Sequence, residues 1–201
     1  MFYYSPMQFA FDFMGGRPAV SDGKRRPDRY FFALLPDPET EQLIDRLAHE
    51  LWLRLQLPKL PVGIGKYHLS LWSLHVPDGP DGPEVAAACR AAPLVDQAPF
   101  SICFNQVASF GGPPNWPLVL MSTVEMPAAR WLQLAIGEAL RRGGVKSPAQ
   151  PFEPHVSLVY DKRRWASFRV PDLVWNVRDF ALVRSMDRKR YDILGCWPLR
   201  G

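Results

Sequence analysis

Cysteine and histidine are scarce in this 201-residue chain, and no apolar run reaches the length of a membrane span. The three cysteines are widely spaced and form no Cys-x-x-Cys pair, which argues against a disulfide framework or a structural zinc site and favours a reducing compartment. The aromatic N-terminus has no basic residue before it, so it is a poor signal peptide. We therefore expect a cytoplasmic protein without a membrane partner.

Motifs typical of nucleotide-binding proteins and serine hydrolases are also absent. Without a Gly-x-Ser-x-Gly turn, a serine nucleophile has no support, and no glycine-rich phosphate loop or dinucleotide motif occurs. The histidines described below have no carboxylate or thiolate companions at ligand spacing, so a metal centre is a poor fit. We expect neither a metal nor an organic cofactor.

The composition is that of an ordinary globular domain, with 47% hydrophobic and 22% charged residues. A net charge of +4 permits an anionic partner, but it is weaker than the basic bias of a dedicated nucleic-acid-binding module. Residues 1–28 contain several glycines and prolines and a Lys-Arg-Arg cluster, which predicts a flexible N-terminal extension. Residues 29–201 are predicted to form one bilobed domain.

Two short stretches of the chain match each other. Residues 68–71 read His-Leu-Ser-Leu and residues 155–158 read His-Val-Ser-Leu, so the histidines lie 87 residues apart (from 68 to 155). Alternate side chains of a strand share a face, so each motif places its His and its Ser on one side. Imidazoles exchange protons near neutral pH, and hydroxyls donate hydrogen bonds to phosphate oxygens. Two such strands side by side would suit a phosphodiester.

The order of predicted elements around the two motifs repeats as well. In each copy an apolar strand is followed by a helix that a proline opens, then by a loop and the motif strand. The predicted ranges are strand 29–35, a helix from Pro38 and strand 66–74, then strand 117–123, a helix from Pro127 and strand 155–159. Further alternating segments cover residues 100–107, 173–183 and 191–194. We predict an α+β fold, a pseudo-symmetric duplication with two antiparallel sheets and a helix in each lobe.

Strand parity adds two residues to the face that carries His68 and Ser70. Lys66 fits contact with a phosphate, and it fits a solvated strand start equally well. Trp72 fits stacking on a base, and it fits packing in the core or at its rim at least as well. Both are substrate-binding candidates with a structural alternative.

Paired His-x-Ser-apolar strands in a pseudo-symmetric chain of this length resemble the two-histidine phosphoesterase superfamily. The closest resemblance is to the bacterial and archaeal RNA 2′,3′-cyclic phosphodiesterases, also called 2′-5′ RNA ligases. It covers residues 29–201 and includes the opening strand, both motifs with Pro154 before the second, and the closing stretch 180–191. The paired motifs are its specific part.

This resemblance implies a bilobed α+β fold with the active site between the lobes. It also implies metal-free hydrolysis of an RNA 2′,3′-cyclic phosphate end to a 2′-phosphate, with His155 as general base and His68 as general acid. Ser70 and Ser157 would hold the phosphate oxygens, and the reverse reaction would join RNA ends through a 2′-5′ bond. Tyr160 stands where many relatives have Arg, and strand parity turns it away from the histidines unless a bulge intervenes.

Two other functions remain open at this point. One is a phosphodiesterase for small cyclic nucleotides or ADP-ribose cyclic phosphate, and the other is a non-catalytic RNA-binding module. Intact His and Ser in both motifs argue against the second. The expected partner is RNA with a 2′,3′-cyclic phosphate end or a small cyclic nucleotide, bound by a monomer.

Overall fold

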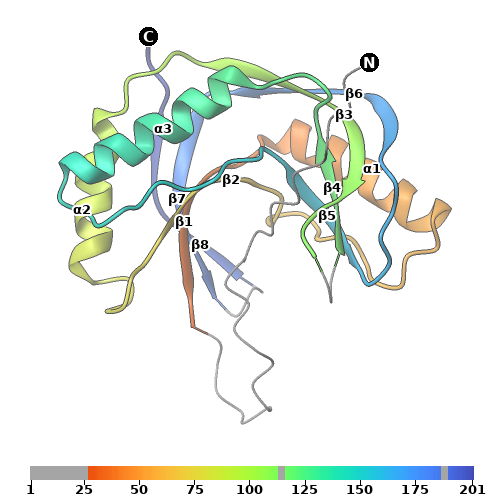
Figure 1. Cartoon of the computed structure of the whole chain (residues 1–201), viewed down its shortest axis with the longest axis horizontal. Coiled ribbons are helices and arrows are strands. Elements are labelled where there is room, and N and C mark those ends of the chain that lie inside the picture. The colour runs from red at the N-terminus through yellow and green to blue at the C-terminus, as the bar shows by residue number, and fades with distance from the viewer. Residues whose placement is uncertain (1–26, 113–115, 187–189) are drawn as a thin grey trace, which may run out of the picture.

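The computed structural model describes residues 27–112, 116–186 and 190–201. The predicted extension, residues 1–28, lies outside this range except for its last two residues. The helices are α1 (Pro38–Arg54), α2 (Pro83–Ala91), the single 3-10 turn η1 (Ala92–Leu94) and α3 (Pro127–Arg142). The strands are β1 (Arg29–Leu34), β2 (Leu69–Leu74), β3 (Phe100–Ser109), β4 (Trp116–Met121), β5 (Val156–Asp161), β6 (Phe168–Val177), β7 (Asp179–Met186) and β8 (Arg190–Pro198). The predicted α+β class is confirmed (Figure 1).

The strands form one eight-stranded antiparallel sheet in the order β6-β3-β4-β5-β2-β1-β7-β8. Two sheets were expected, and the structure instead joins two four-stranded halves at the motif strands β2 and β5. The junction is narrow, because its register consists of the pair Leu69 and Val156. The two motifs therefore meet where the halves meet.

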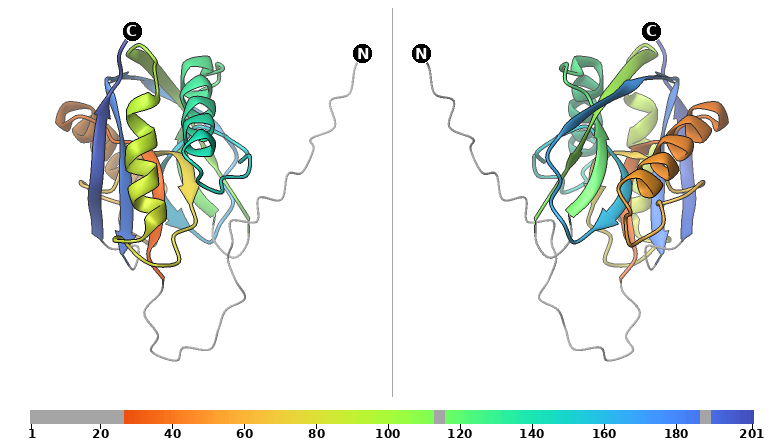
Figure 2. Two further views of the ribbon diagram at one scale, coloured as in Figure 1. Left: turned by 90° about the vertical axis from the view of Figure 1, so that its left-hand side faces the viewer. Right: turned by 90° about the vertical axis from the view of Figure 1, so that its right-hand side faces the viewer.

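Each half contains the predicted strand–helix–motif strand unit, β1-α1-β2 in one and β4-α3-β5 in the other. Each helix lies against strands of the opposite half: α1 contacts β5 and β6, whereas α3 contacts β2. The two side views show α1 toward one end of the sheet and α2 with α3 toward the other end (Figure 2). This exchange explains why one hydrophobic cluster contains residues of both halves.

Local sequence explains where α1 begins. The Asp37 carboxylate accepts hydrogen bonds from the backbone N–H groups of Glu39 and Thr40 at 3.1 and 3.0 Å, and Pro38 occupies the first turn. Asp37 is therefore the N-cap of α1. Helix α2 was not predicted, because it is only nine residues long and follows a turn-rich segment.

The two faces of the sheet differ. On the helix-covered face, Leu69, Leu71, Val156 and Leu158 belong to the main core, as strand parity predicted. The opposite face carries a smaller cluster of Phe31, Ala33, Ala181 and Val183, against which Leu35 and Tyr191 pack. No helix in the described part of the chain has the length and apolar character needed to cross a membrane.

Candidate active site

Both motif histidines lie one residue before their strands, since β2 begins at Leu69 and β5 at Val156. These two residues pair across the antiparallel junction. Continued by one residue in each direction, this register brings His68 opposite Ser157 and His155 opposite Ser70. The junction therefore gathers the two histidines and two serines that the sequence singled out.

The two imidazoles are anchored in the same way. His68 Nδ1 lies 2.8 Å from the carbonyl oxygen of Lys66, and His155 Nδ1 lies 2.7 Å from that of Glu153. A carbonyl oxygen only accepts hydrogen bonds, so each Nδ1 carries the hydrogen and donates. In the neutral ring, Nε2 then keeps the lone pair and is the atom that can take up a proton.

Aromatic side chains from distant parts of the sequence contact both histidines. The ring centroids of Phe31 and Tyr191 lie 5.1 and 5.4 Å from that of His68, and the Tyr191 hydroxyl is 3.4 Å from His68 Nδ1. Phe110 lies over His155 with ring centroids 4.3 Å apart and an interplanar angle of 32°. No sequence pattern pointed to these rings, although strand parity on β1 places Phe31 on the face away from the main core.

Burial and charge set the proton affinity of the two rings. Burial lowers the pKa of His68 to about 4; the carbonyl of Lys66 opposes this, and the positive charges of His155 and Arg29 add to it. Burial also lowers the pKa of His155, but the carbonyl and the carboxylate of Glu153 oppose that effect. Both rings are therefore stabilised in the neutral form, and the charges around His155 favour protonation more than those around His68 do.

A cation lies beside the His68 cluster. Arg29 pairs across strands with Ser185, and Ser185 pairs with Tyr191, so the three form a row across β1, β7 and β8. The positive charge of Arg29 lowers the pKa of His68, as noted, and acts on Tyr191 in the same direction. Burial is the larger effect on Tyr191 and, with the phenol of Tyr160, raises its pKa to about 12. Tyr191 therefore remains a neutral hydroxyl beside the imidazole.

A bulge in β2 makes the parity prediction for Trp72 wrong. Ser70 pairs with Ala33 and Trp72 pairs with Phe32, so Leu71 is an extra residue and the side-chain alternation reverses after it. Trp72 is consequently buried in the main core, where its Nε1 donates to the Ser147 hydroxyl. Stacking of Trp72 on a base is excluded by this position.

A matching bulge in β5 brings Tyr160 to the motif face. Val119 pairs with Ser157 and Leu118 pairs with Val159, which makes Leu158 the extra residue. Tyr160 is therefore exposed on the side of Ser157, and it is close enough to Tyr191 to raise the pKa of that residue.

The third substrate-binding candidate is Lys66. The structure gives it a backbone role, because its carbonyl holds His68 Nδ1. Its side chain is half-buried. Contact between this side chain and a phosphate remains a prediction.

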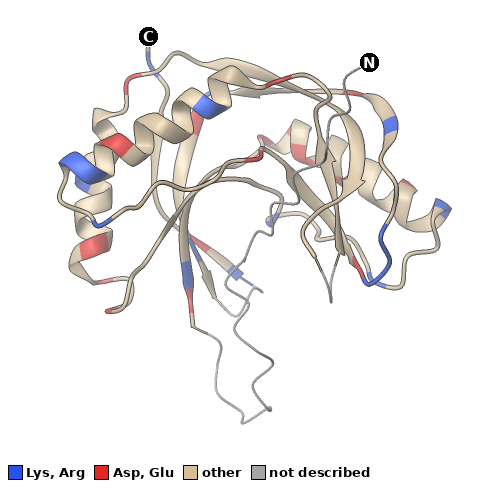
Figure 3. Ribbon diagram, viewed as in Figure 1, with Lys and Arg blue, Asp and Glu red and all other residues tan. Residues whose placement is uncertain are grey.

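Other charged groups are spread over the surface. In the portion of the chain that is described, Lys and Arg alternate with Asp and Glu over helices and strand ends (Figure 3). The same residues contain no group of three or more His, Cys, Asp or Glu side chains placed to hold a metal ion.

Comparisons with known proteins agree with this geometry. The structure is similar to E. coli LigT solved with 3′-AMP, with a TM-score of 0.70 and 20% identity over 88% of this chain and 100% of that chain. It is also similar to TT0787 of Thermus thermophilus, with a TM-score of 0.60 and 26% identity over 86% of this chain and 98% of that chain. Comparison with curated protein sequences gives no match. Residues 36–188 match the family model described as 2′-5′ RNA ligase superfamily. The chain thus belongs to the 2′-5′ RNA ligase superfamily of two-histidine phosphoesterases, whose activity is of the phosphodiesterase and ligase type.

Proposed function

We propose that the protein hydrolyses the 2′,3′-cyclic phosphate end of RNA to a 2′-phosphate, and that it can run the reverse 2′-5′ ligation. The observation that carries this proposal is the pair of imidazoles just before two neighbouring strands, each held through Nδ1 by a backbone carbonyl. Such a pair leaves two Nε2 atoms for proton transfer, one to each side of a phosphorus atom. Acid–base chemistry at a phosphodiester needs two groups of this kind.

In the proposed reaction, one histidine removes a proton from water as the water oxygen attacks phosphorus. The bond between phosphorus and O3′ breaks, and the other histidine gives its proton to O3′. The products are a 2′-phosphate and a free 3′-hydroxyl, so atoms and protons balance. The ligation direction reverses the two roles.

The charges around the rings support an order of roles opposite to the one that the family resemblance implies. Glu153 makes protonation of His155 easier, and Arg29 makes protonation of His68 harder. We therefore assign the general acid of hydrolysis to His155 and the general base to His68. A base must be neutral and an acid protonated at the start of the step.

Phosphate binding in this proposal uses hydroxyls and one guanidinium. Ser70 and Ser157, each two residues after a histidine, donate to the non-bridging oxygens. Arg29 supplies the positive charge that complements the phosphate anion, at the position beside His68 described above. Tyr160 occupies the motif face and supplies a hydroxyl where many relatives have a guanidinium.

The test is turnover of a short RNA that ends in a 2′,3′-cyclic phosphate, with EDTA present and with 2′- and 3′-phosphate products resolved. We expect a 2′-phosphate product, and we expect His68→Gln and His155→Gln each to lose about 10²–10⁴-fold in rate. The exposed His75, changed to Gln, is the matched control and should keep full activity. Near-normal turnover in either motif variant, or activity that EDTA removes and a divalent metal restores, would contradict the proposal.

The second candidate is a phosphodiesterase for small cyclic nucleotides. The dispersed charge supports it, because a long polyanion gains affinity from many phosphate contacts (Figure 3). The structural neighbour LigT was solved with the mononucleotide 3′-AMP, which suggests ligands of the same size for this chain. Salt separates the two candidates: KM for RNA should rise steeply with salt concentration, whereas KM for a cyclic mononucleotide should change little.

A further inference from the structure

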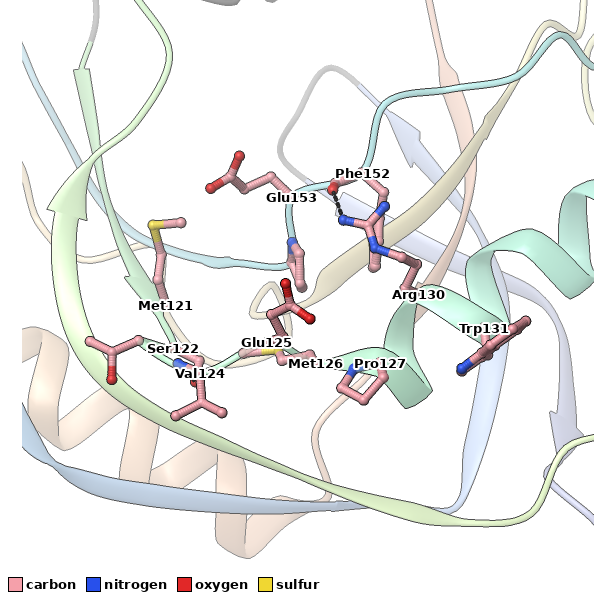
Figure 4. A pocket seen from close by; sticks show the side chains of 12 residues that line it. Met121, Ser122, Val124, Glu125, Met126, Pro127, Arg130, Trp131, Phe152 and Glu153 are labelled. Atoms are coloured by element: carbon pink, nitrogen blue, oxygen red, sulfur yellow. Dashed lines mark hydrogen bonds between the residues drawn. The ribbon is translucent and has the colours of Figure 1, made fainter. Parts of the chain in front are cut away.

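A pocket of about 480 Å³ adjoins the segment that carries His155. It lies between the end of β4, the start of α3 and residues 152–154, and Pro154 in its wall directly precedes His155. Figure 4 shows the carboxylates of Glu125 and Glu153 at this pocket, with the Arg130 guanidinium bonded to the Phe152 carbonyl oxygen at 3.3 Å. We call it the base pocket.

The corresponding position in the first half is filled. Tyr67 directly precedes His68, is almost fully buried, and donates from its hydroxyl to Asp45 on α1 at 2.8 Å. The Gly65 N–H donates to Glu41 on α1 at 2.7 Å, which ties the same loop down. Pro154 stands in the place of Tyr67 in the second half and has no ring hydroxyl to reach the helix. Among the described residues, the segment before His68 is therefore closed against α1, whereas a pocket opens at the segment before His155.

The lining of the base pocket suits a flat, uncharged group better than a phosphate. The lining carries two carboxylates, Glu125 and Glu153, against one guanidinium, that of Arg130, so its formal charge is negative. The phosphate of a bound nucleotide therefore belongs on the side of the serines and Arg29. Carboxylates accept hydrogen bonds from amino groups, as in their pairing with the cytosine amino group. Thioethers and aromatic rings contact flat rings well, and the pocket supplies Met121, Met126 and Trp131, of which Trp131 is 68% exposed.

We propose that the base pocket binds the base of the nucleotide whose cyclic phosphate lies at the two histidines, and that it favours bases with an exocyclic amino group. This inference rests on the proposed function. Adenine, cytosine and guanine present amino donors to the carboxylates, whereas uracil presents one N–H flanked by two carbonyl oxygens. Uracil should therefore be the poorest base. The base pocket is also close enough to the catalytic residues for one nucleotide to reach both, because the chain from Glu153 in the pocket to His155 spans only ~7 Å when extended.

The first measurement compares kcat/KM for the 2′,3′-cyclic phosphates of adenosine, cytidine and uridine with that of ribose 2′,3′-cyclic phosphate, which has no base. We expect the adenosine and cytidine substrates to exceed the other two by about tenfold or more. Glu125→Gln should reduce this advantage, because a carboxamide can turn its N–H₂ group toward a carbonyl oxygen. Glu50→Gln is the matched control: Glu50 lines a separate pocket between α1 and β6, and its variant should keep the full preference.

The second measurement is calorimetric binding of adenosine and uridine 2′-monophosphates, which does not depend on turnover. Tighter binding of the adenosine compound that Glu125→Gln removes would support the base pocket even in a preparation without activity. Equal affinity for both compounds, or a base preference that Glu125→Gln and Trp131→Ala leave intact, would overturn it. Hydrolysis of all four cyclic substrates at one rate would overturn the base pocket and leave the proposed function standing. Base-selective binding without hydrolysis of any cyclic substrate would overturn the proposed function and leave the base pocket standing.

Discussion

Acidification should destabilise this protein earlier than carboxylate titration alone would, because the half-buried His68 is held in its neutral form between Phe31 and Tyr191. Burial lowers the pKa of His68 to about 4, whereas the ordinary value is 6.5. Between these two pH values, His68 of the unfolded chain binds a proton, whereas His68 of the folded protein stays neutral. The gap corresponds to up to about 3 kcal/mol of stability, present above the unfolded value and lost progressively as the pH falls toward the folded one. His155 contributes in the same direction.

The assay is urea unfolding followed by tryptophan fluorescence at several pH values between about 7 and 4.5, above the range in which most carboxylates titrate. The wild-type protein should lose a large part of its free energy of unfolding over this interval, and His68→Gln should lose much less. His75→Gln, on an exposed side chain, should behave as the wild type does. An equal pH dependence in wild type and His68→Gln would refute the claim that the imidazole is held neutral by burial.

Three shorter predictions address the rest of the site and its support. Ser70→Ala and Ser157→Ala should each lower kcat/KM about tenfold or more, because each loses a hydrogen bond to a charged phosphate oxygen. The corresponding Thr variants keep the hydroxyl and should retain activity. Unchanged kinetics in both Ala variants would show that the hydroxyls do not bind the phosphate. Arg29→Gln should raise KM for cyclic phosphates and raise the pKa of His68 seen by NMR, and an unchanged titration would remove Arg29 from the site. Gly137→Ala should destabilise the fold by about 1–3 kcal/mol, because the new methyl group meets the Trp72 ring; thermal unfolding at the wild-type temperature would contradict the packing.

The features that the sequence predicted correctly are those with local causes. An Asp-Pro pair at the start of α1 and a proline at the start of α3 mark helix ends, because caps and fixed backbone angles act within a few residues. Apolar spacing also identified buried helix positions such as Ile44 and Leu132, but the stripes it predicts include Leu43 and Trp131, which are exposed. The motif pair was visible because the His and the Ser of each copy lie within three residues of each other in the sequence.

The bulges at Leu71 and Leu158 could not be predicted, because a bulge depends on the register with a neighbouring strand. Each strand alone reads as regular alternation. That is why parity placed Trp72 on the wrong face of β2, and why the face of Tyr160 depended on whether β5 contains a bulge. The aromatic partners of the histidines could not be predicted for a related reason: Phe31, Phe110 and Tyr191 lie far from the histidines in the sequence.

The duplicated motif produces two chemically different histidines, because the residues around it are not duplicated. The position two residues before the histidine is Lys66 in one copy and Glu153 in the other, and of the two histidines Arg29 affects the pKa of His68 and not that of His155.

This asymmetry predicts which histidine becomes dispensable when the leaving group needs no proton. With sulfur in place of the bridging O3′, a thiolate departs unprotonated, so His155→Gln should regain much of its ~10²–10⁴-fold loss while His68→Gln should not. Recovery of His68→Gln instead would assign the acid to His68, as the family resemblance implies, and would show that bound phosphate outweighs the charges that surround the rings in the free protein.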